Sequence, residues 1–497
     1  MVKTKNFLAL DYGASSGRAI IGKFSGRKFE LEEAYRFDNR PVYAGGTLYW
    51  DILRLYSELK AGISAAFRKN IGIASIGVDT WGCDFALLDK DKNLLSNPVH
   101  YRDKRTIGMR GKMEKIIPEY EIYEKTQAQI LEIAALYQLF SLKTGEKQIL
   151  ESARYFLMIS DLLNFYLTGE LASEYTNAST SIALDQKNKK WEKYILAKLG
   201  IPSDIFMDVS EPGTIIGKVN REVCGELQIG SVPVALPAYD TAGEIFAVPV
   251  SNTNKTKNWA YLNCGTWAMA GMVLDEPLVN KMGYAEGFGN EGGPFNKYHF
   301  LTNIIGMWTI QQCRKKWIEE KGEDITYDKI MEAAISSRDK NIFIDAGHPV
   351  FEKEIFDMPG CIRNFCANTK QEIPESVGDI ARVFYESLAL KYASSVKKLG
   401  EITGKKVELL HLVGGGSKDK LLCQYISNAS ELPVIAGPAE TTSMGNLVIQ
   451  AIAMREIKDA IEARDVIINS ANLSTYEPQD LAKWQIKTEK FSALFYK

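Results

Sequence analysis

The sequence predicts an α/β protein built from two lobes of similar construction. Its 497 residues are too many for one compact core. Short apolar runs alternate with helical patterns, which is typical of sheets covered by helices. In addition, a strand, a turn of small and hydroxyl residues and a second strand open the chain and recur in its second half. We therefore expect two lobes with related sheets.

The first lobe opens with strands in close succession and then alternates helix with strand. The expected strands lie at residues 7–10, 18–24, 29–37 and 73–78, and the expected helix lies at 53–68. Glycines supply the turn chemistry between the first strands. Because the first strands follow one another like a meander and a helix then returns the chain to the sheet, we expect a mixed sheet.

The opening pattern returns in the second half of the chain. Residues 260–263 read as a strand, residues 264–266 (Cys-Gly-Thr) as a turn, and residues 267–274 as a second strand. The likeness to the opening lies in the pattern and not in the letters. It predicts a second lobe that repeats the first.

A polar connection at residues 247–257 is the expected boundary between the lobes. We accordingly assign residues 1–248 to an N-terminal domain and residues 249–497 to a C-terminal domain. The sequence contains no short repeat, so solenoid folds are not expected.

Composition excludes several classes of protein. Sixty basic residues against 62 acidic ones give a net charge of −2, so neither nucleic acid nor a membrane surface is an expected partner. The apolar stretch at residues 7–10 is too short for a signal peptide, and no run approaches the length of a membrane span, so we expect a cytoplasmic location. Scattered cysteines and histidines argue against disulfides and against a zinc or iron centre.

The segment DYGASSGRAII ends a buried strand with Asp11 and continues with small and hydroxyl residues. Such a turn allows backbone N–H groups and the hydroxyls of Ser15 and Ser16 to approach phosphate oxygens, and Asp11 could hold hydrated Mg²⁺ beside them. A plain hairpin with a capping Asp explains the same residues equally well.

Two further acids follow short apolar strands. In IGVDTWGCDF, Trp81 and Gly82 lie beside carboxylates, which suits a polyol that offers both C–H surface and hydroxyls; the alternative is a tight turn with Trp81 in the core. In LPAYDTAG, Asp240 could accept a hydroxyl proton, as phosphoryl transfer requires, or could simply cap a turn.

The segment VELLHLVGGGSKDKLLCQYI places three glycines between a strand at residues 407–413 and a helix. Glycines there let a nucleotide or its phosphates approach the backbone. They could also serve only for close packing of the helix. The sequence contains no Walker A motif, so a P-loop kinase is excluded.

Taken in this order, these segments resemble the FGGY carbohydrate kinases. The resemblance covers nearly the whole chain, because it includes the further segments YRDKRT, ALYQL, LTGE with EYTNAST, CGTW, NEGG, NIIGMW and ANLSTYEP. The resemblance implies two ribonuclease-H-like, actin-like ATPase domains with a catalytic cleft between them. It also implies ATP-dependent phosphorylation of a ketose, and it is closest to members that convert L-rhamnulose to L-rhamnulose 1-phosphate in rhamnose catabolism.

The resemblance assigns roles to individual residues. Asp240 matches the general base, and Asp11 would lie near Mg²⁺, through water. With Trp81, the expected sugar-lining residues are Gly82, Tyr239, Asp240, Thr241 and Asn303. The expected ATP-binding residues are Ala14, Ser15, Ser16, Gly17, Arg18, Thr266, Gln311 and Gly415. The implied partners are a ketose and ATP, and we expect a monomer or homodimer.

Two departures from the family pattern leave the sugar open. The family usually has His immediately before the catalytic Asp-Thr, whereas this chain has Tyr239, and the stretch QAQILEIAALYQL carries Glu132 and Ile133 where the family differs. L-Fuculose or another ketose or polyol is the alternative substrate, since one altered polar contact can redirect specificity. An actin-like ATPase without a sugar substrate is a more remote alternative.

Overall fold

The computed structural model describes residues 4–69, 71–250, 258–351 and 355–496. The chain divides into two compact units. The first contains the described residues of Met1–Ser251, Val273–Phe300 and Thr441–Ser470, and the second those of Asn252–Met272, Leu301–Glu440 and Ala471–Lys497. The two-lobed α/β architecture expected from the sequence is therefore confirmed. Of the expected boundary at 247–257, residues 251–257 lie outside the described residues.

The first unit is organised around a mixed sheet with the strand order β11-β12-β6-β1-β2-β3. Its strands are β1 (Lys5–Tyr12), β2 (Ser16–Phe24), β3 (Phe29–Asp38), β6 (Ile73–Thr80), β11 (Ile215–Lys218) and β12 (Pro233–Ala235). β1 runs parallel to β6, and β6 parallel to β12, whereas β2, β3 and β11 are antiparallel to their neighbours. The strands predicted for the opening of the chain, and the mixed sheet, are thus confirmed.

The second unit repeats this topology. The second sheet has the order β15-β16-β14-β13-β17-β18-β19. Its strands are β13 (Trp259–Cys264), β14 (Trp267–Leu274), β15 (Gly289–Gly293), β16 (Lys297–Ile305), β17 (Leu409–Val413), β18 (Val434–Ala436) and β19 (Ser474–Tyr476). β13 pairs antiparallel with β14 and parallel with β17, as β1 does with β2 and β6. The recurrence predicted from the sequence pattern is therefore a repeat of the sheet itself.

Helices and short strands complete the first unit. The helices are α1 (Ile52–Phe67), α2 (Met109–Met113), α3 (Glu119–Thr126), α4 (Ala135–Thr144), α5 (Lys147–Ser152), α6 (Ile159–Thr168), α7 (Tyr175–Ser179), α8 (Lys193–Leu199), α9 (Arg221–Leu227), α10 (Asp240–Phe246), α11 (Lys281–Ala285), α17 (Thr441–Ala453) and α18 (Ala460–Ser470). The short strands are β4 (Val42–Ala44), β5 (Thr47–Tyr49), β7 (Phe85–Leu88), β8 (Tyr155–Met158), β9 (Leu184–Asp185), β10 (Lys190–Trp191) and β15 (Gly289–Gly293). The helix predicted at 53–68 is α1, which begins after the capping side chain of Asp51.

The second unit contains longer helices. They are α12 (Trp308–Lys321), α13 (Tyr327–Ser336), α14 (Met358–Asn368), α15 (Val377–Thr403), α16 (Lys420–Ser430) and α19 (Leu481–Phe495). The longest, α15, begins with a capping box formed by Ser376 and Asp379 and ends at Gly404. No helix in the described part of either unit is long and apolar enough to cross a membrane.

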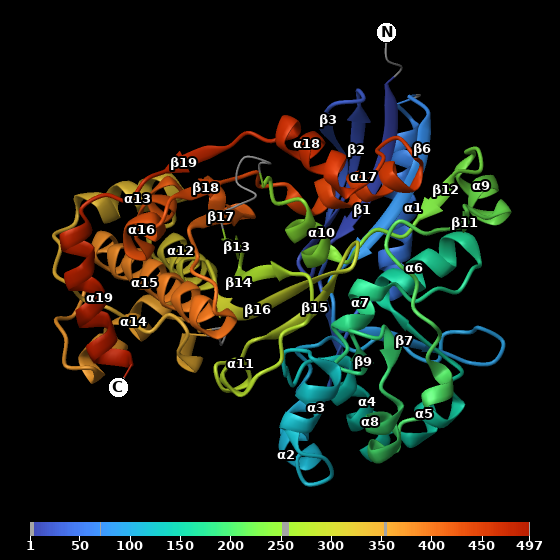
Figure 1. Ribbon diagram of the computed structural model, residues 1–497, viewed down its shortest axis with the longest axis horizontal. Helices are drawn as coiled ribbons and strands as arrows, with labels where there is room; N and C mark the ends of the chain where they lie inside the picture. The colour runs from blue at the N-terminus through green and yellow to red at the C-terminus, as the bar shows by residue number, and fades with distance from the viewer. Residues whose placement is uncertain (1–3, 70, 251–257, 352–354, 497) are drawn as a thin grey trace. The chain divides into compact units, whose positions relative to one another are not determined.

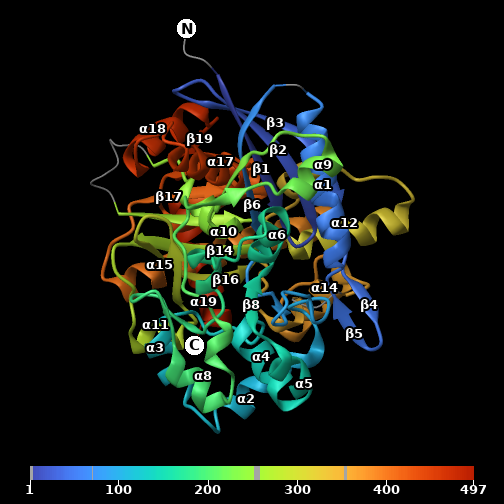
Figure 2. The same ribbon diagram turned by 90° about the vertical axis from the view of Figure 1, so that its right-hand side faces the viewer.

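The first unit joins segments that are far apart in the sequence. Figure 1 shows α17 and α18, from the end of the chain, beside β1, β2 and β3 from its beginning, and the turned view agrees (Figure 2). Apolar side chains of α17, such as Met444, Leu447 and Val448, share a buried core with Phe7 and Ala9 of β1. The first sheet is therefore completed by residues more than 400 positions away.

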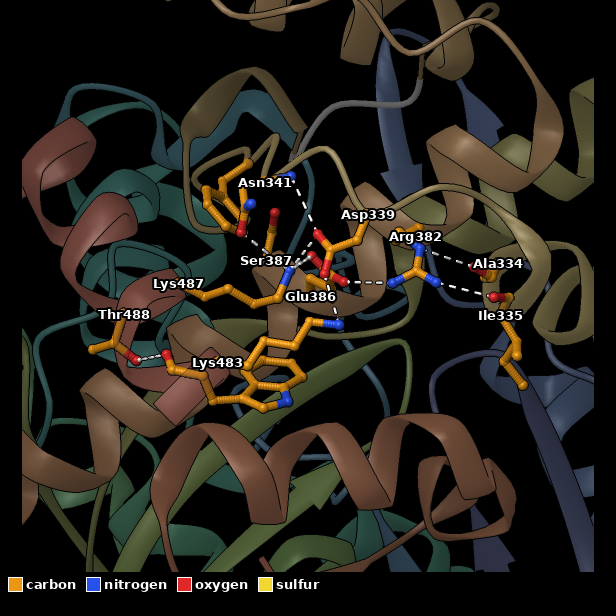
Figure 3. Close-up of polar contacts among 12 residues, drawn as sticks. Ala334, Ile335, Asp339, Asn341, Arg382, Glu386, Ser387, Lys483, Lys487 and Thr488 are labelled. Atoms are coloured by element: carbon orange, nitrogen blue, oxygen red, sulfur yellow. Dashed lines mark hydrogen bonds and ion pairs between the residues drawn. The ribbon is translucent and has the colours of Figure 1, made fainter. Parts of the chain in front are cut away.

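A buried ionic cluster docks α19 in the second unit (Figure 3). The Lys487 ammonium, with 1% of its side chain exposed, donates to Asp339 Oδ1 and to Glu386 Oε2, each at 2.7 Å. Arg382 donates to the other oxygen of Glu386 at 2.9 Å. Each buried charge thus has an opposite partner, which offsets the cost of removing it from water.

Replacing Lys487 with Met is expected to lower the free energy of unfolding by about 3 kcal/mol, because Glu386 and Asp339 lose a buried partner. Burial alone would raise the pKa of Asp339, but hydrogen bonds from Lys483 and Lys487 hold this pKa below its ordinary value. The stabilisation is therefore present above the ordinary Asp pKa of about 3.9 and is lost as pH falls through the lowered folded-state pKa.

Denaturant unfolding and amide exchange within α19 measure this effect. The matched control is Lys483→Met, because Lys483 contacts the same Asp339 from a side chain that is 54% exposed; we expect it to cost less than about 1 kcal/mol. Equal losses in the two variants would show that burial of Lys487 does not matter.

Candidate active site

Three aspartates gather at one edge of the first sheet. Asp11 lies near the end of β1 and is paired in register with Asp79 near the end of β6. Asp240 follows β12 after a short connection and is the first residue of α10. Because β1, β6 and β12 are parallel, their carboxyl ends meet at the same edge. The fold therefore brings together acids that are 68 and 161 positions apart in sequence, Asp11 to Asp79 and Asp79 to Asp240.

Burial and mutual repulsion perturb these carboxyl groups. Burial, followed by the charge of Asp11, raises the pKa of Asp79 well above its ordinary value, and Asp79 Oδ1 is a buried oxygen without a hydrogen-bond partner among the described residues. Burial raises the pKa of Asp240 to about 8, with the Asp11 charge adding to the rise, although hydrogen bonds from Thr241 oppose it. Asp240 can therefore exchange a proton near neutral pH.

Helix α17 fixes this edge of the sheet through polar side chains. The Ser443 hydroxyl donates to Asp11 Oδ2 at 2.6 Å, and Arg18 Nη2 donates to the same oxygen at 2.6 Å. Asn446 donates to Asp79. Gln450 donates to the Leu8 carbonyl at 3.0 Å. The polar residues of α17 were not predicted as site residues, and no local signal places them there.

Close backbone packing holds α10 against α17. A Cβ atom on Gly445 would lie 2.1 Å from the carbonyl oxygen of Gly243, so the two helices touch where both lack side chains. Small residues of α17 and α10 therefore pack against each other inside the first unit. Since α10 begins with Asp240, this contact positions the candidate base.

The first hairpin turn combines open and packed residues. The Gly13 N–H donates to the Ser16 carbonyl at 3.0 Å. Ser15 is exposed, and Ala14 and Ser16 are half-buried. A Cβ on Gly17 would lie 2.2 Å from the Phe37 ring, so packing explains that glycine. The segment is thus a hairpin whose turn also leaves the serines accessible.

Trp81 lies in the core, as the alternative interpretation of its motif had it. Its side chain is 4% exposed and its ring centroid lies 4.1 Å from that of Trp50. Both indole N–H groups donate to the buried Asp84, from Trp50 at 2.6 Å and from Trp81 at 3.0 Å. Burial raises the pKa of Asp84 to about 6 in spite of these bonds. Trp81 is therefore a core residue next to Gly82 in the sequence.

Tyr239 connects Asp240 to an acid that was not predicted. The Tyr239 N–H donates to Thr176 Oγ1 at 3.0 Å, and its hydroxyl donates to Glu291 in β15. Thr241 donates to Asp240 through its N–H and, at 3.1 Å, through its hydroxyl. Glu291 belongs to the NEGG segment, whose likeness to the family gave no role for the acid. The contact of this half-buried acid with Tyr239 is visible only in the fold.

The second unit brings together two of the predicted nucleotide residues. The turn between β13 and β14 is closed by the Gly265 N–H, which donates to the Trp267 carbonyl at 2.8 Å. The Thr266 hydroxyl in this turn donates to Gln311 Oε1 of α12 at 3.3 Å. Asn303, the predicted sugar contact, lies on β16 of the same unit and is half-buried.

The glycine turn after β17 contains residues of two kinds. A Cβ on Gly416 would lie 2.6 Å from Cys264 Sγ, so Gly416 is required by packing. A Cβ on Gly415 would meet nothing within 4 Å. The packing explanation therefore holds for Gly416 and does not account for Gly415, whose backbone is open to a ligand.

The oxygen donors at the sheet edge suit a hydrated Mg²⁺ ion. Mg²⁺ prefers oxygen ligands, keeps several waters and uses one or two carboxylates. Asp11 and Asp79 supply such oxygens, and Asp79 Oδ1 has no protein partner among the described residues. No group of three or more His, Cys, Asp or Glu side chains in the described ranges is arranged to hold a metal ion directly. The donor set thus fits an ion bound largely through water.

Comparison with protein families identifies both halves of the chain. The model described as "FGGY family of carbohydrate kinases, N-terminal domain" matches residues 6–247. The corresponding C-terminal domain model matches residues 260–454. Together the two matches cover the aspartates of the first sheet, the Thr266 turn and the glycine turn at Gly415.

Individual proteins show the same similarity. A rhamnulokinase of Bacteroides thetaiotaomicron is 38% identical over 481 residues, covering 97% of each chain. A rhamnulokinase of Oceanobacillus iheyensis is 36% identical over 94% of this chain and 97% of its own. Among solved structures, gluconate kinase from Lactobacillus acidophilus has a TM-score of 0.81 at 16% identity, covering 99% of this chain and 97% of its own. Plasmodium falciparum glycerol kinase with ADP has a TM-score of 0.77 at 14% identity, covering 99% of both.

Alanine substitutions at Gly415 and at Gly416 are expected to show which of the two glycines is required by packing. Gly416→Ala forces a methyl group against Cys264 and should lower the free energy of unfolding by about 1–3 kcal/mol. Gly415→Ala adds a methyl group in open space and should leave stability within about 0.5 kcal/mol. Thermal unfolding of both variants measures the difference. A large loss of stability in Gly415→Ala would make Gly415 a packing residue as well.

Proposed function

Since the chain belongs to the FGGY family of carbohydrate kinases, we propose that it transfers the γ-phosphoryl group of ATP to L-rhamnulose, giving L-rhamnulose 1-phosphate and ADP. Relatives named rhamnulokinase, 32–38% identical over nearly the whole chain, support this substrate. The observation that carries the chemistry is Asp240, a carboxylate with a pKa of about 8 at the edge of the first sheet.

Asp240 acts as the general base in this proposal. Its carboxylate accepts the proton of the primary hydroxyl as that oxygen attacks the γ-phosphorus in line. A base whose pKa lies near the working pH is strong enough to take the proton and is still ionised in a useful fraction of molecules. Thr241 fixes the carboxylate through two hydrogen bonds, so that it is held ready for the transfer.

Each substrate is assigned chiefly to one domain. We assign the base, most of the sugar contacts and the first phosphate loop to the N-terminal domain, residues 1–248, and the nucleotide chiefly to the C-terminal domain, residues 249–497. The proposed sugar contacts are Gly82, Tyr239, Asp240, Thr241 and Asn303, and Trp81 is a core residue next to Gly82 in the sequence. The proposed ATP contacts are Ala14, Ser15, Ser16, Gly17, Arg18, Thr266, Gln311 and Gly415.

Mg²⁺, when bound with ATP, supplies positive charge that offsets the charge of the phosphates. Asp11 would hold its hydration shell, because Arg18 and Ser443 fix the Asp11 carboxylate at the sheet edge. The hydroxyls of Ser15 and Ser16 and nearby N–H groups would contact phosphate oxygens. Arg18 would then lie between an acid and the phosphates.

A different ketose is the second candidate, and Tyr239 is the observation that favours it. Rejection of a wrong sugar depends on unpaired polar groups in the site, so Tyr in place of the family's usual His can change which hydroxyl pattern is accepted. L-Fuculose is the nearest alternative substrate.

Coupled ADP release with Mg²⁺ and ATP tests the function. We expect turnover with L-rhamnulose and little with L-fuculose, L-ribulose, D-xylulose, glycerol or no sugar. Preference for another sugar would keep the kinase and replace the substrate. ADP release that does not depend on any sugar would contradict the proposal and favour an actin-like ATPase.

Asp240→Asn is expected to lower kcat by about two to four powers of ten, because the amide cannot accept the proton. Sugar binding should largely persist. The raised pKa of Asp240 means that, between about pH 4 and 8, its carboxyl group binds a proton more tightly in the folded state than in the unfolded state. The ionised carboxylate therefore does not stabilise the fold, and replacing Asp240 should not lower stability at neutral pH.

Single-turnover kinetics and thermal unfolding measure both quantities. Asp79→Asn provides a comparison, because Asp79 is buried at the same edge but is not the proposed base. A fully active Asp240→Asn variant would remove Asp240 as the base.

A further inference from the structure

Glu291 makes a contact that the proposed chemistry does not use. This half-buried acid on β15 accepts the hydrogen bond of the Tyr239 hydroxyl. Burial raises the pKa of Glu291 to about 7, and the bond from Tyr239 opposes that rise. Tyr239 itself is 4% exposed, and its pKa is raised well above the ordinary value, first by burial and then by the Glu291 charge. Tyr239 therefore keeps its proton, and that proton points at Glu291.

Helix α7 holds both partners of this pair. Thr176 Oγ1 accepts from the Tyr239 N–H at 3.0 Å, and Ser179 Oγ accepts from the N–H of Gly292, the neighbour of Glu291, at 2.8 Å. Thr176 also donates to the capping Glu174 at 2.6 Å. A Cβ on Gly292 would lie 2.7 Å from the Tyr175 ring, so β15 packs closely on this helix. The bond between Tyr239 and Glu291 is thus built into the first unit.

The pair lies at the proposed sugar site. Tyr239 directly precedes the candidate base Asp240, to which Thr241 donates two hydrogen bonds. The thiol of Cys83, next to Gly82, has a pKa raised by burial and by the charges of Asp84, Glu291 and Asp240. Glu291 and Asp240 therefore act on the same small region beside Gly82.

The direction of this hydrogen bond decides what Tyr239 can offer a ligand. A tyrosine hydroxyl has one proton to donate and lone pairs that accept. With its proton committed to Glu291, the oxygen of Tyr239 can only accept from a further group. A neutral histidine, the residue that the family resemblance leads us to expect here, can present a ring N–H donor instead.

We propose that Glu291 is a positioning residue of the sugar site, which accepts the hydrogen bond of the Tyr239 hydroxyl and so presents the Tyr239 oxygen to a donating hydroxyl of the ketose. This inference rests on the proposed function and names the contact that sets specificity. A ketose with a hydroxyl at that place gains a hydrogen bond, whereas the corresponding deoxy sugar leaves a buried acceptor unpaired.

A double-mutant cycle tests the proposal, with KM for the sugar, kcat and KM for ATP measured for Tyr239→Phe, Glu291→Ala and the double variant. Each single variant should raise KM for the sugar about 10-fold, the value of one lost hydrogen bond of about 1.4 kcal/mol. We expect kcat to change less than KM, and KM for ATP to stay unchanged. The double variant should be no worse than Tyr239→Phe alone, because Glu291 acts only through the Tyr239 hydroxyl.

Glu291→Gln provides the rescue. Its amide carbonyl can still accept the hydrogen bond of the Tyr239 hydroxyl, so KM for the sugar should return to within about 3-fold of the unaltered protein. Tyr284→Phe is the matched control, because the Tyr284 hydroxyl donates to Glu119 at 2.7 Å elsewhere in the first unit. That control should leave KM for the sugar unchanged. Thermal unfolding of every variant confirms that each is folded.

The outcomes are separable. The measurements use whichever ketose the unaltered protein phosphorylates fastest, so a sugar other than L-rhamnulose corrects the substrate and leaves the cycle intact. Glu291→Ala that costs as much in the Tyr239→Phe background as alone overturns the proposal. A fall in kcat with an unchanged KM for the sugar also overturns it. Absence of turnover with every sugar contradicts the function and this inference together.

Discussion

Like charges at one sheet edge are the constraint on which the rest of the first unit depends. Parallel pairing of β1 with β6 puts Asp11 beside Asp79, and β12 leads to Asp240 at the same edge. The sheet cannot avoid this crowding, because parallel strands end together. The raised pKa of Asp240 follows from burial and this neighbourhood. Crowding of carboxylates costs free energy, but it also raises the pKa of Asp240 toward the value that a general base needs.

Hydrogen-bond donors for this edge come from a distant part of the chain. Ser443 and Asn446 of α17 donate to Asp11 and Asp79, and Gly445 brings the helix into backbone contact with α10. The crowded acids therefore gain donors, and Asp240 gains a rigid support. This explains why a helix near the end of the sequence belongs to the first compact unit.

Local signals in the sequence predict the strands well, but they do not predict which distant segments pack against them. Residues 7–10 and 73–78 were predicted because apolar runs and turn glycines are visible in the letters. The repeat of the sheet was likewise visible in the turn at residues 264–266. The return of α17 and the bond from Tyr239 to Glu291 were not, since each depends on a long-range contact that leaves no local pattern. The difference between Gly416, which packs on the distant Cys264, and Gly415, which does not, was likewise not visible in the sequence.

The pH dependence of kcat/KM for the sugar, at saturating ATP, tests the central claim most directly, because it reports the ionisation of the base before the sugar binds. The raised pKa of Asp240 predicts activity that increases with pH and is half-maximal near a pH of about 8. Ionised Asp240 accepts the proton, so acid pH should suppress transfer. A profile that is flat from about pH 6 to 9, or one whose midpoint lies near the ordinary Asp pKa of about 4, would contradict the account.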